Sequence, residues 1–195
     1  MSALDRRDAV AALLRNRDGL IVVAGLGSPA YDVAACGDDA LDFPLWGGMG
    51  GAAMLGLGLA LGQPDRNVLV ATGDGEMLMG LGSLATIGAQ SPAKLSIVVL
   101  DNELYGETGR QQTHTALGVD LAAVARACGL AARTVTQQSD VATLRDAIHA
   151  ANGPLFAVLK VASDEVPRAF PPRNGAYLTN RTREALLGRN AALEA

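Results

Sequence analysis

Two apolar stretches of the sequence each end in a polar side chain that could bind a metal ion. Asp74 stands in a Gly-Asp-Gly triplet directly after the run 67–72, and Asn102 follows the run 95–101, 28 positions later. If both runs are neighbouring strands of a parallel sheet, the carboxylate and the amide oxygen emerge at the same edge, where α/β proteins bind ligands. This pair of hard oxygen ligands suits Mg²⁺, which completes its shell with phosphate and water.

The residues around Asp74 suit an anionic ligand. Gly73 and Gly75 allow the backbone to come close to a phosphate. A helix expected to begin at Glu76 presents unpaired N–H groups and positive partial charge at its amino end. The triplet alone is a common turn sequence, so a simple turn is the alternative. The order of strand, triplet, helix, strand and asparagine makes the pattern specific.

Strands and helices alternate along the chain. We expect strands at 20–24, 67–72, 95–101, 131–135 and 155–161, and helices at 5–15, 29–37, 48–61, 76–88, 120–128, 140–151 and 181–189. Continuously apolar strands with short connections indicate an α/β fold of three layers, a parallel sheet with helices on both faces. We expect one domain over 1–195, with a proline-rich loop at 163–180 that could cover a site.

Composition narrows the class of protein. The 195 residues are 49% hydrophobic and 18% charged, which favours a compact globular domain. A net charge of −4 without a basic run argues against nucleic-acid binding. Cys36 and Cys128 match no metal or redox spacing, so buried thiols are expected. The charged N-terminal segment is not typical of a signal peptide, and the apolar stretch 47–62 is short and rich in glycine. These features predict a cytoplasmic protein with no membrane partner.

The triplet and the asparagine, one helix and one strand apart, resemble the signature of thiamine diphosphate enzymes. The resemblance implies the thiamine diphosphate-binding fold, with thiamine diphosphate and Mg²⁺ as cofactors. It implies that the side chains of Asp74 and Asn102 and the carbonyl of Leu104 bind the metal. Gly27 and Ser28 would lie near the diphosphate. Further cofactor contacts are implied at Gly48, Gly73, Gly75, Glu76, Tyr105 and Gly106.

The segment Leu-Trp-Gly-Gly-Met-Gly-Gly at 45–51 also matches this family. The resemblance implies that Met49 wedges under the cofactor and imposes its V shape. The carbonyl of Gly47 would accept a hydrogen bond from the 4′-amino group, and the Met49 N–H would bond the pyrimidine ring. The alternative from the residue type alone is that Met49 belongs to the core.

The run 101–113, Asp-Asn-Glu-Leu-Tyr-Gly-Glu-Thr-Gly-Arg-Gln-Gln-Thr, resembles sulfopyruvate and phosphonopyruvate decarboxylases. The resemblance implies decarboxylation of a 2-oxo acid, and the length matches a free-standing beta chain. Glu107 replaces a serine of that pattern and would repel an anionic substrate that it faced. Glu76 replaces a small residue, so its carboxylate must point away from the diphosphate.

Two further polar side chains follow the expected metal loop. His114 either lines the mouth of the substrate site or is an ordinary surface residue. Arg110 either clamps a sulfonate or carboxylate or is a solvated loop residue.

A partner chain is implied by what the sequence does not contain. Thiamine diphosphate enzymes activate the cofactor with a glutamate in a second, similarly folded domain, and this chain is too short to hold one. We therefore expect an alpha-type subunit that carries this pyrimidine-side domain, in an α₂β₂ or larger assembly. A carboligase subunit like that of acetolactate synthase and a non-catalytic cofactor-binding subunit stay open as alternatives.

Two other classes of protein fit less well. Residues 25–30 match the dinucleotide pattern Gly-x-Gly-x-x-Ala, but Asp42 falls too early for the acidic residue that binds the ribose. An oxidoreductase subunit with an iron–sulfur cluster would need four thiolates, and the chain has two cysteines.

Overall fold

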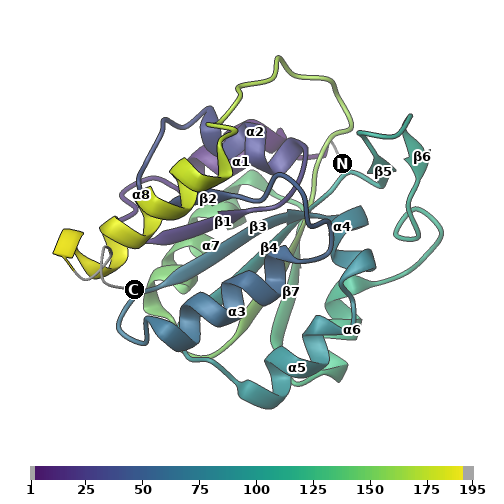
Figure 1. The fold of residues 1–195 in the computed structure, drawn as a ribbon. Helices are drawn as coiled ribbons and strands as arrows, with labels where there is room; N and C mark the ends of the chain where they lie inside the picture. The colour runs from purple at the N-terminus through teal and green to yellow at the C-terminus, as the bar shows by residue number, and fades with distance from the viewer. Residues whose placement is uncertain (1–2, 191–195) are drawn as a thin grey trace.

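A six-stranded parallel sheet forms the centre of the molecule, as predicted (Figure 1). The computed structural model describes residues 3–190. The strand order is β2-β1-β3-β4-β8-β7, and every pairing within this sheet is parallel. The strands are β1 (Ile21–Ala24), β2 (Asp42–Pro44), β3 (Val68–Gly73), β4 (Leu95–Asp101), β7 (Ala131–Val135) and β8 (Leu155–Lys160).

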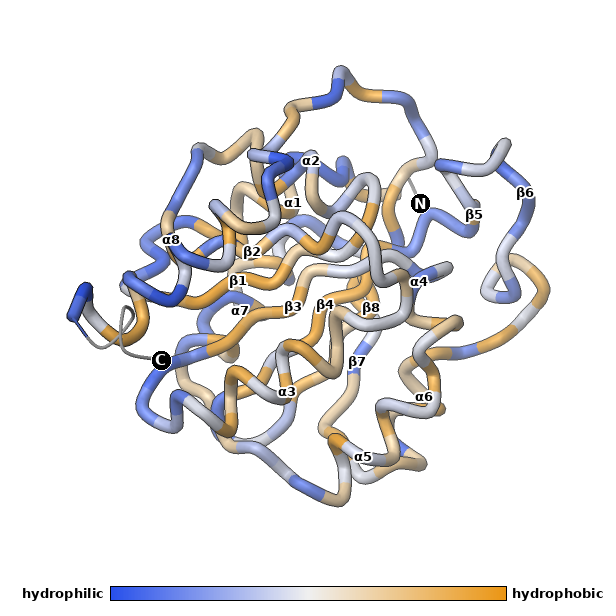
Figure 2. The backbone as a smooth tube through the Cα atoms, viewed as in Figure 1, coloured by the Kyte–Doolittle hydropathy of each residue, from blue (hydrophilic) through white to orange (hydrophobic). Residues whose placement is uncertain are grey.

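Helices cover both faces of the sheet, which gives the expected three layers. One face packs against α1 (Arg6–Leu13), α2 (Ser28–Ala34) and α7 (Gln138–Ala150). The other packs against α3 (Ala52–Gly62), α4 (Asp74–Met79), α5 (Ser83–Gln90) and α6 (Leu121–Ala127). Side chains alternate between the two cores along each strand, so Val22 joins the first and Val23 the second. Figure 2 shows the strands β1, β3, β4 and β8 largely in the hydrophobic colour.

A short antiparallel ribbon follows β4 and was not predicted. It pairs β5 (Leu104–Tyr105) with β6 (Gln111–Gln112). The turn between them contains Gly109, whose φ of +112° lies in the region that favours glycine. The ribbon returns the chain over the carboxyl ends of β3 and β4, and this return positions several side chains of the candidate site.

One predicted helix is broken in two. The sequence predicts a helix over 76–88, but α4 ends at Met79 and α5 begins at Ser83. A Cβ on Gly80 would lie 2.3 Å from the carbonyl oxygen of Gly50, so the intervening turn packs directly on the loop before α3. The prediction was wrong because apolar periodicity continues through a break that two glycines and tertiary packing decide.

Other boundaries also differ from the prediction. The helix expected from residue 48 begins at Ala52, because Gly50 has a φ of +87° that a helix does not allow. The last helix, α8 (Gly175–Leu187), begins inside the expected loop 163–180 and packs against β2. Asn174 starts it by accepting a hydrogen bond from the Tyr177 N–H at 3.0 Å.

The surface differs from the prediction at the cysteines. Cys36 is exposed and Cys128 is half-buried, so the prediction of buried thiols was wrong. Cys36 lies beyond the end of α2, outside the helical face that packs on the sheet.

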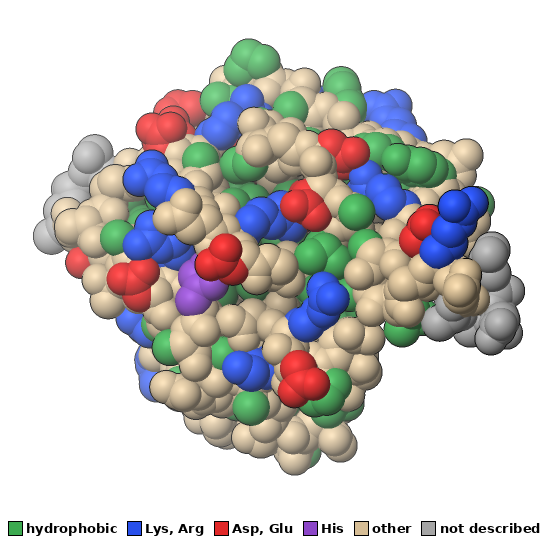
Figure 3. Space-filling view, turned by 90° about the vertical axis from the view of Figure 1, so that its left-hand side faces the viewer, with side chains coloured by type: hydrophobic (Ala, Val, Ile, Leu, Met, Phe, Trp, Pro, Cys, Tyr) green, Lys and Arg blue, Asp and Glu red, His purple; other side chains and the backbone are tan. Residues whose placement is uncertain are grey.

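On the face shown in Figure 3, acidic and basic side chains are interspersed rather than gathered by sign. Among the described residues, none of the helices has the length and apolar character that crossing a membrane requires.

Candidate functional site

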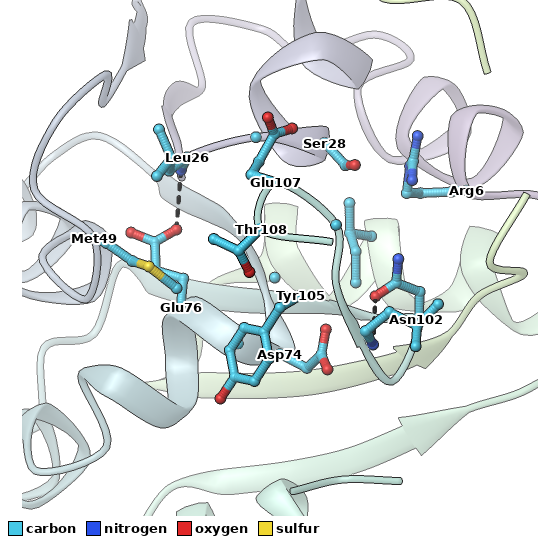
Figure 4. Close-up of a pocket in the computed structure, with 16 residues that line it drawn as sticks. Arg6, Leu26, Ser28, Met49, Asp74, Glu76, Asn102, Tyr105, Glu107 and Thr108 are labelled. Carbon is cyan, nitrogen blue, oxygen red and sulfur yellow. Dashed lines mark hydrogen bonds between the residues drawn. The ribbon is translucent and has the colours of Figure 1, made fainter. Parts of the chain in front are cut away.

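A cavity opens at the carboxyl ends of β1, β3 and β4 (Figure 4). The chain leaves β1 for β2 and then returns to β3 on the other side of β1, so the switch point of the sheet lies here. Most of the predicted site residues line this cavity, which we call the cofactor cavity. They are Gly27, Ser28, Met49, Gly73, Asp74, Gly75, Glu76, Asn102, Leu104, Tyr105, Gly106 and Glu107.

Asp74 is a buried carboxylate at the end of β3. Its Oδ2 atom accepts a hydrogen bond from the Thr113 hydroxyl at 2.5 Å, and the Thr115 hydroxyl oxygen lies 3.3 Å from the same atom. Burial raises the pKa of Asp74, the bond from Thr113 lowers it, and the nearby charge of Asp101 raises it further. A cation beside Asp74 would therefore relieve an unfavourable buried charge.

A chain of hydrogen bonds runs from Asp74 to the edge of the site. Thr113 and Thr115 are linked by a hydroxyl contact of 2.8 Å, Thr115 donates to Asp101 Oδ1 at 2.8 Å, and Lys160 Nζ donates to Asp101 Oδ2 at 2.8 Å. Lys160 reaches Glu103 at 2.6 Å as well. Sequence reasoning missed these supporting residues. The Thr-x-Thr spacing gave no clear signal, because residues 114–118 form turns and the two hydroxyls meet there rather than along an extended strand.

Asn102 and Leu104 form a turn at the end of β4. The Leu104 N–H donates to Asn102 Oδ1 at 3.1 Å, and Glu103 between them has a φ of +65°. The carbonyls of Glu103 and Tyr105 accept bonds from the returning segment. Because successive carbonyls of a strand point to opposite edges, the Leu104 carbonyl faces away from β6. The Leu104 carbonyl therefore makes no hydrogen bond between β5 and β6.

The set of ligands suits a small hard cation. No group of three or more His, Cys, Asp or Glu side chains in residues 3–190 could hold a metal by itself. One carboxylate, one amide oxygen and one backbone carbonyl instead match a site in which Mg²⁺ takes its remaining ligands from phosphate and water. Asp74, Asn102 and Leu104 all line the cofactor cavity, so the residues present fit such an ion.

Glu76 turns its carboxylate toward the loop after β1. Its Oε2 atom accepts hydrogen bonds from the Thr72 hydroxyl at 2.9 Å and the Leu26 N–H at 3.1 Å. A Cβ on Gly25 would lie only 1.9 Å from this oxygen, so any side chain at this position would displace the Glu76 carboxylate. Burial raises the pKa of Glu76, while these hydrogen bonds lower it. Glu76 thus ties the end of β3 to the loop that carries Gly27.

Met49 lies in the loop before α3 and not in the core. The residue is 37% exposed, and its side chain forms one end of the cofactor cavity (Figure 4). This exposure excludes the alternative that Met49 is a core residue. Gly47 and Gly48 are exposed beside it and do not line the cofactor cavity.

Glu107 and His114 occupy different surroundings. Glu107 lines the cofactor cavity, and its carboxylate lies 3.7 Å from the guanidinium of Arg168 in the proline-rich loop. This pairing offsets part of the repulsion expected toward an anionic substrate. His114 is exposed and does not line the cofactor cavity, although Thr113 and Thr115 on either side of it are buried.

A second, more polar cavity adjoins the first. We call it the arginine cavity, because it is lined by the guanidinium-bearing residues Arg6, Arg7, Arg110 and Arg168, together with residues 163–166. Arg110 donates to the Ser163 carbonyl at 2.9 Å, so it is tied to the loop. Ser28, Asn102 and Glu107 line both cavities. The proline-rich loop therefore covers one side of the site.

Comparison with known proteins identifies the family. The family described as "Thiamine pyrophosphate enzyme, C-terminal TPP binding domain" matches residues 29–161. Thiamine pyrophosphate is another name for thiamine diphosphate. The chain belongs to this family of thiamine pyrophosphate enzymes, and the resemblance inferred from the sequence is confirmed.

Several relatives are similar to this chain in sequence. Sulfopyruvate decarboxylase subunit beta of Methanocaldococcus jannaschii is 43% identical over 119 residues, which are 61% of this chain and 62% of that protein. Its counterpart in Methanothermobacter thermautotrophicus is 39% identical over 158 residues, 81% of this chain and 82% of that one. Phosphonopyruvate decarboxylase of Streptomyces viridochromogenes is 41% identical over 141 residues, 72% of this chain but 35% of its own length.

A solved structure supports the fold. Benzoylformate decarboxylase from Polynucleobacter necessarius aligns with a TM-score of 0.67 at 21% sequence identity. The alignment covers 84% of this chain and 34% of that enzyme. The chain therefore corresponds to about a third of the larger enzyme, and the predicted α/β fold with helices on both faces of the sheet is confirmed.

Proposed function

We propose that this single-domain chain is the diphosphate-binding beta subunit of a thiamine diphosphate- and Mg²⁺-dependent 2-oxo acid decarboxylase. A sulfopyruvate-like or phosphonopyruvate-like acid is the proposed substrate. The observation that carries the proposal is the buried carboxylate of Asp74 beside Asn102, where β3 and β4 end together. The names of the relatives support the reaction and the substrate class.

Different residues of the cofactor cavity would bind different parts of the cofactor. Asp74, Asn102 and the Leu104 carbonyl would hold Mg²⁺, and the metal would hold the diphosphate. The amino end of α4 would add the N–H groups of Gly75 and Glu76. Met49 would support the thiazolium and pyrimidine rings at the other end of the cavity. When bound, the cofactor supplies the electron sink that decarboxylation needs, while the protein supplies position and charge.

An incomplete surface supports a partner chain. The cofactor cavity holds about 120 Å³, which is less than the ~300–1,000 Å³ typical of small-molecule sites. Beside it, α3 is apolar all round, and Met54 and Leu61 on its outer side are 42% and 52% exposed. Met79 at the end of α4 is 67% exposed. We propose that an alpha-type subunit with the activating glutamate covers this surface, in an α₂β₂ or larger assembly.

The proposal is tested by turnover with the partner present. The chain, purified together with its partner, is supplied with thiamine diphosphate, Mg²⁺ and either sulfopyruvate, phosphonopyruvate or pyruvate. We expect CO₂ and an aldehyde from one of the first two acids, and none from the purified beta chain alone. Asp74→Asn should lower turnover sharply, because it removes the negative charge with which Asp74 would bind Mg²⁺ and leaves the shape of the side chain almost unchanged. Acetolactate formed from pyruvate as the main product would favour the carboligase alternative, and full turnover by the chain alone would contradict the need for a partner.

A further inference from the structure

Arg6 is a nearly buried cation held in place by one of its three nitrogens. It is the first residue of α1, its side chain is 10% exposed, and its Nε atom donates to the carboxylate of Asp32. Asp32 on α2 is fully buried and also accepts a bond from the Nε atom of Arg7 at 3.2 Å. Two guanidinium groups thus share one carboxylate, and the cluster keeps one positive charge that no acidic group within it balances.

Among the described residues, the terminal nitrogens of Arg6 have no hydrogen-bond partner, whereas those of Arg7 and Arg168 each have a partner. Arg7 donates from Nη2 to the Pro167 carbonyl at 2.9 Å, and Arg168 pairs with Glu107. Among the described residues, none accepts a hydrogen bond from Nη1 or Nη2 of Arg6. Arg6 is also the arginine that lines the cofactor cavity as well as the arginine cavity. Its free donors therefore lie where the two cavities meet.

The position of Arg6 within the cofactor cavity indicates which part of a ligand it would meet. Figure 4 shows Arg6 with Ser28 and Asn102 at one end, and Met49 at the opposite end. Asn102, one of the proposed metal ligands, lies on the Arg6 side of this view and lines both cavities together with Arg6. A tetrahedral oxyanion at this end would accept from the guanidinium and neutralise a charge that is otherwise costly to bury.

We propose that Arg6 donates from its terminal nitrogens to the outer phosphate of thiamine diphosphate, with Asp32 fixing the orientation of the guanidinium. The inference rests on the proposed function, since it assumes that the cofactor binds in this cavity. The sulfonate or phosphonate of the substrate has the same chemistry and is the competing source of the anion. The outer phosphate is favoured because Arg6 lines both cavities together with Asn102, a proposed ligand of the metal that would hold the diphosphate.

The test compares Arg6→Gln with Arg7→Gln, measured as the Kd of thiamine diphosphate by calorimetry at saturating Mg²⁺, with the partner chain present. Both variants remove one bond to Asp32, but Arg7 does not line the cofactor cavity, so it controls for damage to the cluster. Loss of a charge-assisted hydrogen bond should raise the Kd of Arg6→Gln roughly 10- to 100-fold. Arg7→Gln should stay within about twofold of the unmodified protein. If Arg6→Gln does not fold, Arg6→Lys provides a second variant. It keeps the positive charge but lacks the paired terminal nitrogens of the guanidinium, so it should still weaken binding.

Each other outcome overturns the inference in a different way. Equal losses in the two variants would mean that Arg6 acts only through Asp32 and the packing of α1. An unchanged Kd in Arg6→Gln, with a raised KM for the 2-oxo acid at saturating cofactor, would assign the guanidinium to the substrate. An unmodified protein that binds no thiamine diphosphate would instead refute the proposed function itself, so the two failures are distinguishable.

Discussion

Thr115 links the two buried carboxylates of the site. Its hydroxyl has one proton, and the shorter of its carboxylate contacts, 2.8 Å to Asp101, identifies the preferred acceptor. The Thr113 hydroxyl donates its proton to Asp74 Oδ2. The threonines therefore hold both carboxylates in place without adding charge, and they leave the remaining oxygen of Asp74 to a ligand.

Removal of the Thr115 hydroxyl should therefore be costly. We expect Thr115→Val to lower the free energy of unfolding by about 1–2 kcal/mol, because the buried Asp101 carboxylate loses a hydrogen-bond donor. Thr115→Ser, which keeps the hydroxyl, should recover most of that loss. Urea denaturation measures both variants, and Thr143→Val on the exposed side of α7 serves as a neutral control. A Thr115→Val protein as stable as the unmodified chain would contradict this account of the network.

At the residue scale, the sequence predicted the proposed metal ligands but not the residues that form hydrogen bonds with them. Asp74 and Asn102 could be proposed because each directly follows an apolar strand. Thr113 and Thr115 reach Asp74 only because an unpredicted ribbon turns the chain back, and local patterns do not encode such long-range contacts. Lys160 lies at the end of a strand whose neighbours could not be assigned from the sequence. The roles of Gly47, Gly48 and His114 stay predictions.

At the scale of elements, close contacts between glycines and backbone position the site. Gly80, in the turn between α4 and α5, packs against the Gly50 carbonyl in the loop that carries Met49. Gly88 in α5 packs in a similar way against the Cys128 carbonyl, where a Cβ would lie 1.8 Å from the oxygen. The first contact supports the cofactor cavity, while the second joins α5 to the end of α6.

These two glycines provide a matched pair of variants. Gly80→Ala and Gly88→Ala should each lower the free energy of unfolding by roughly 1–3 kcal/mol, because a methyl group must displace backbone. Only Gly80→Ala should move the Met49 loop, so the Kd of thiamine diphosphate should rise about tenfold in that variant alone, a change of about 1.4 kcal/mol. Calorimetry on the folded fraction separates the two effects. An equal change in Kd for both variants would argue against a specific role of the Gly50–Gly80 contact.

The same contact explains why some boundaries could not be predicted. The segment 76–88 has apolar residues at helical spacing throughout, so its local pattern favours one continuous helix. The break at Gly80 depends on a loop 30 positions earlier in the chain, which no local window contains. Strand β2 was missed for a similar reason, since three residues ending in Pro44 become a strand only beside β1.

At the scale of the whole molecule, the alternation of apolar strands and helices was sufficient to predict the fold class. The strand order was not predicted, because it depends on which side of β1 each crossover returns. That order creates the switch point where the cofactor cavity lies. The exposed apolar side of α3 has no partner within residues 3–190, and we propose that the alpha-type subunit covers it.

The most direct test of the central claim is calorimetric titration of the unmodified protein with thiamine diphosphate. The titration is made with and without Mg²⁺, for the chain alone and for the chain with its co-purified partner. We expect binding that requires Mg²⁺, because Asp74 and Asn102 would hold the diphosphate through the metal, and that tightens when the partner covers the open side. Binding that is equally strong in the presence of a chelator would contradict the metal assignment, and no binding under any condition would contradict the cofactor site itself.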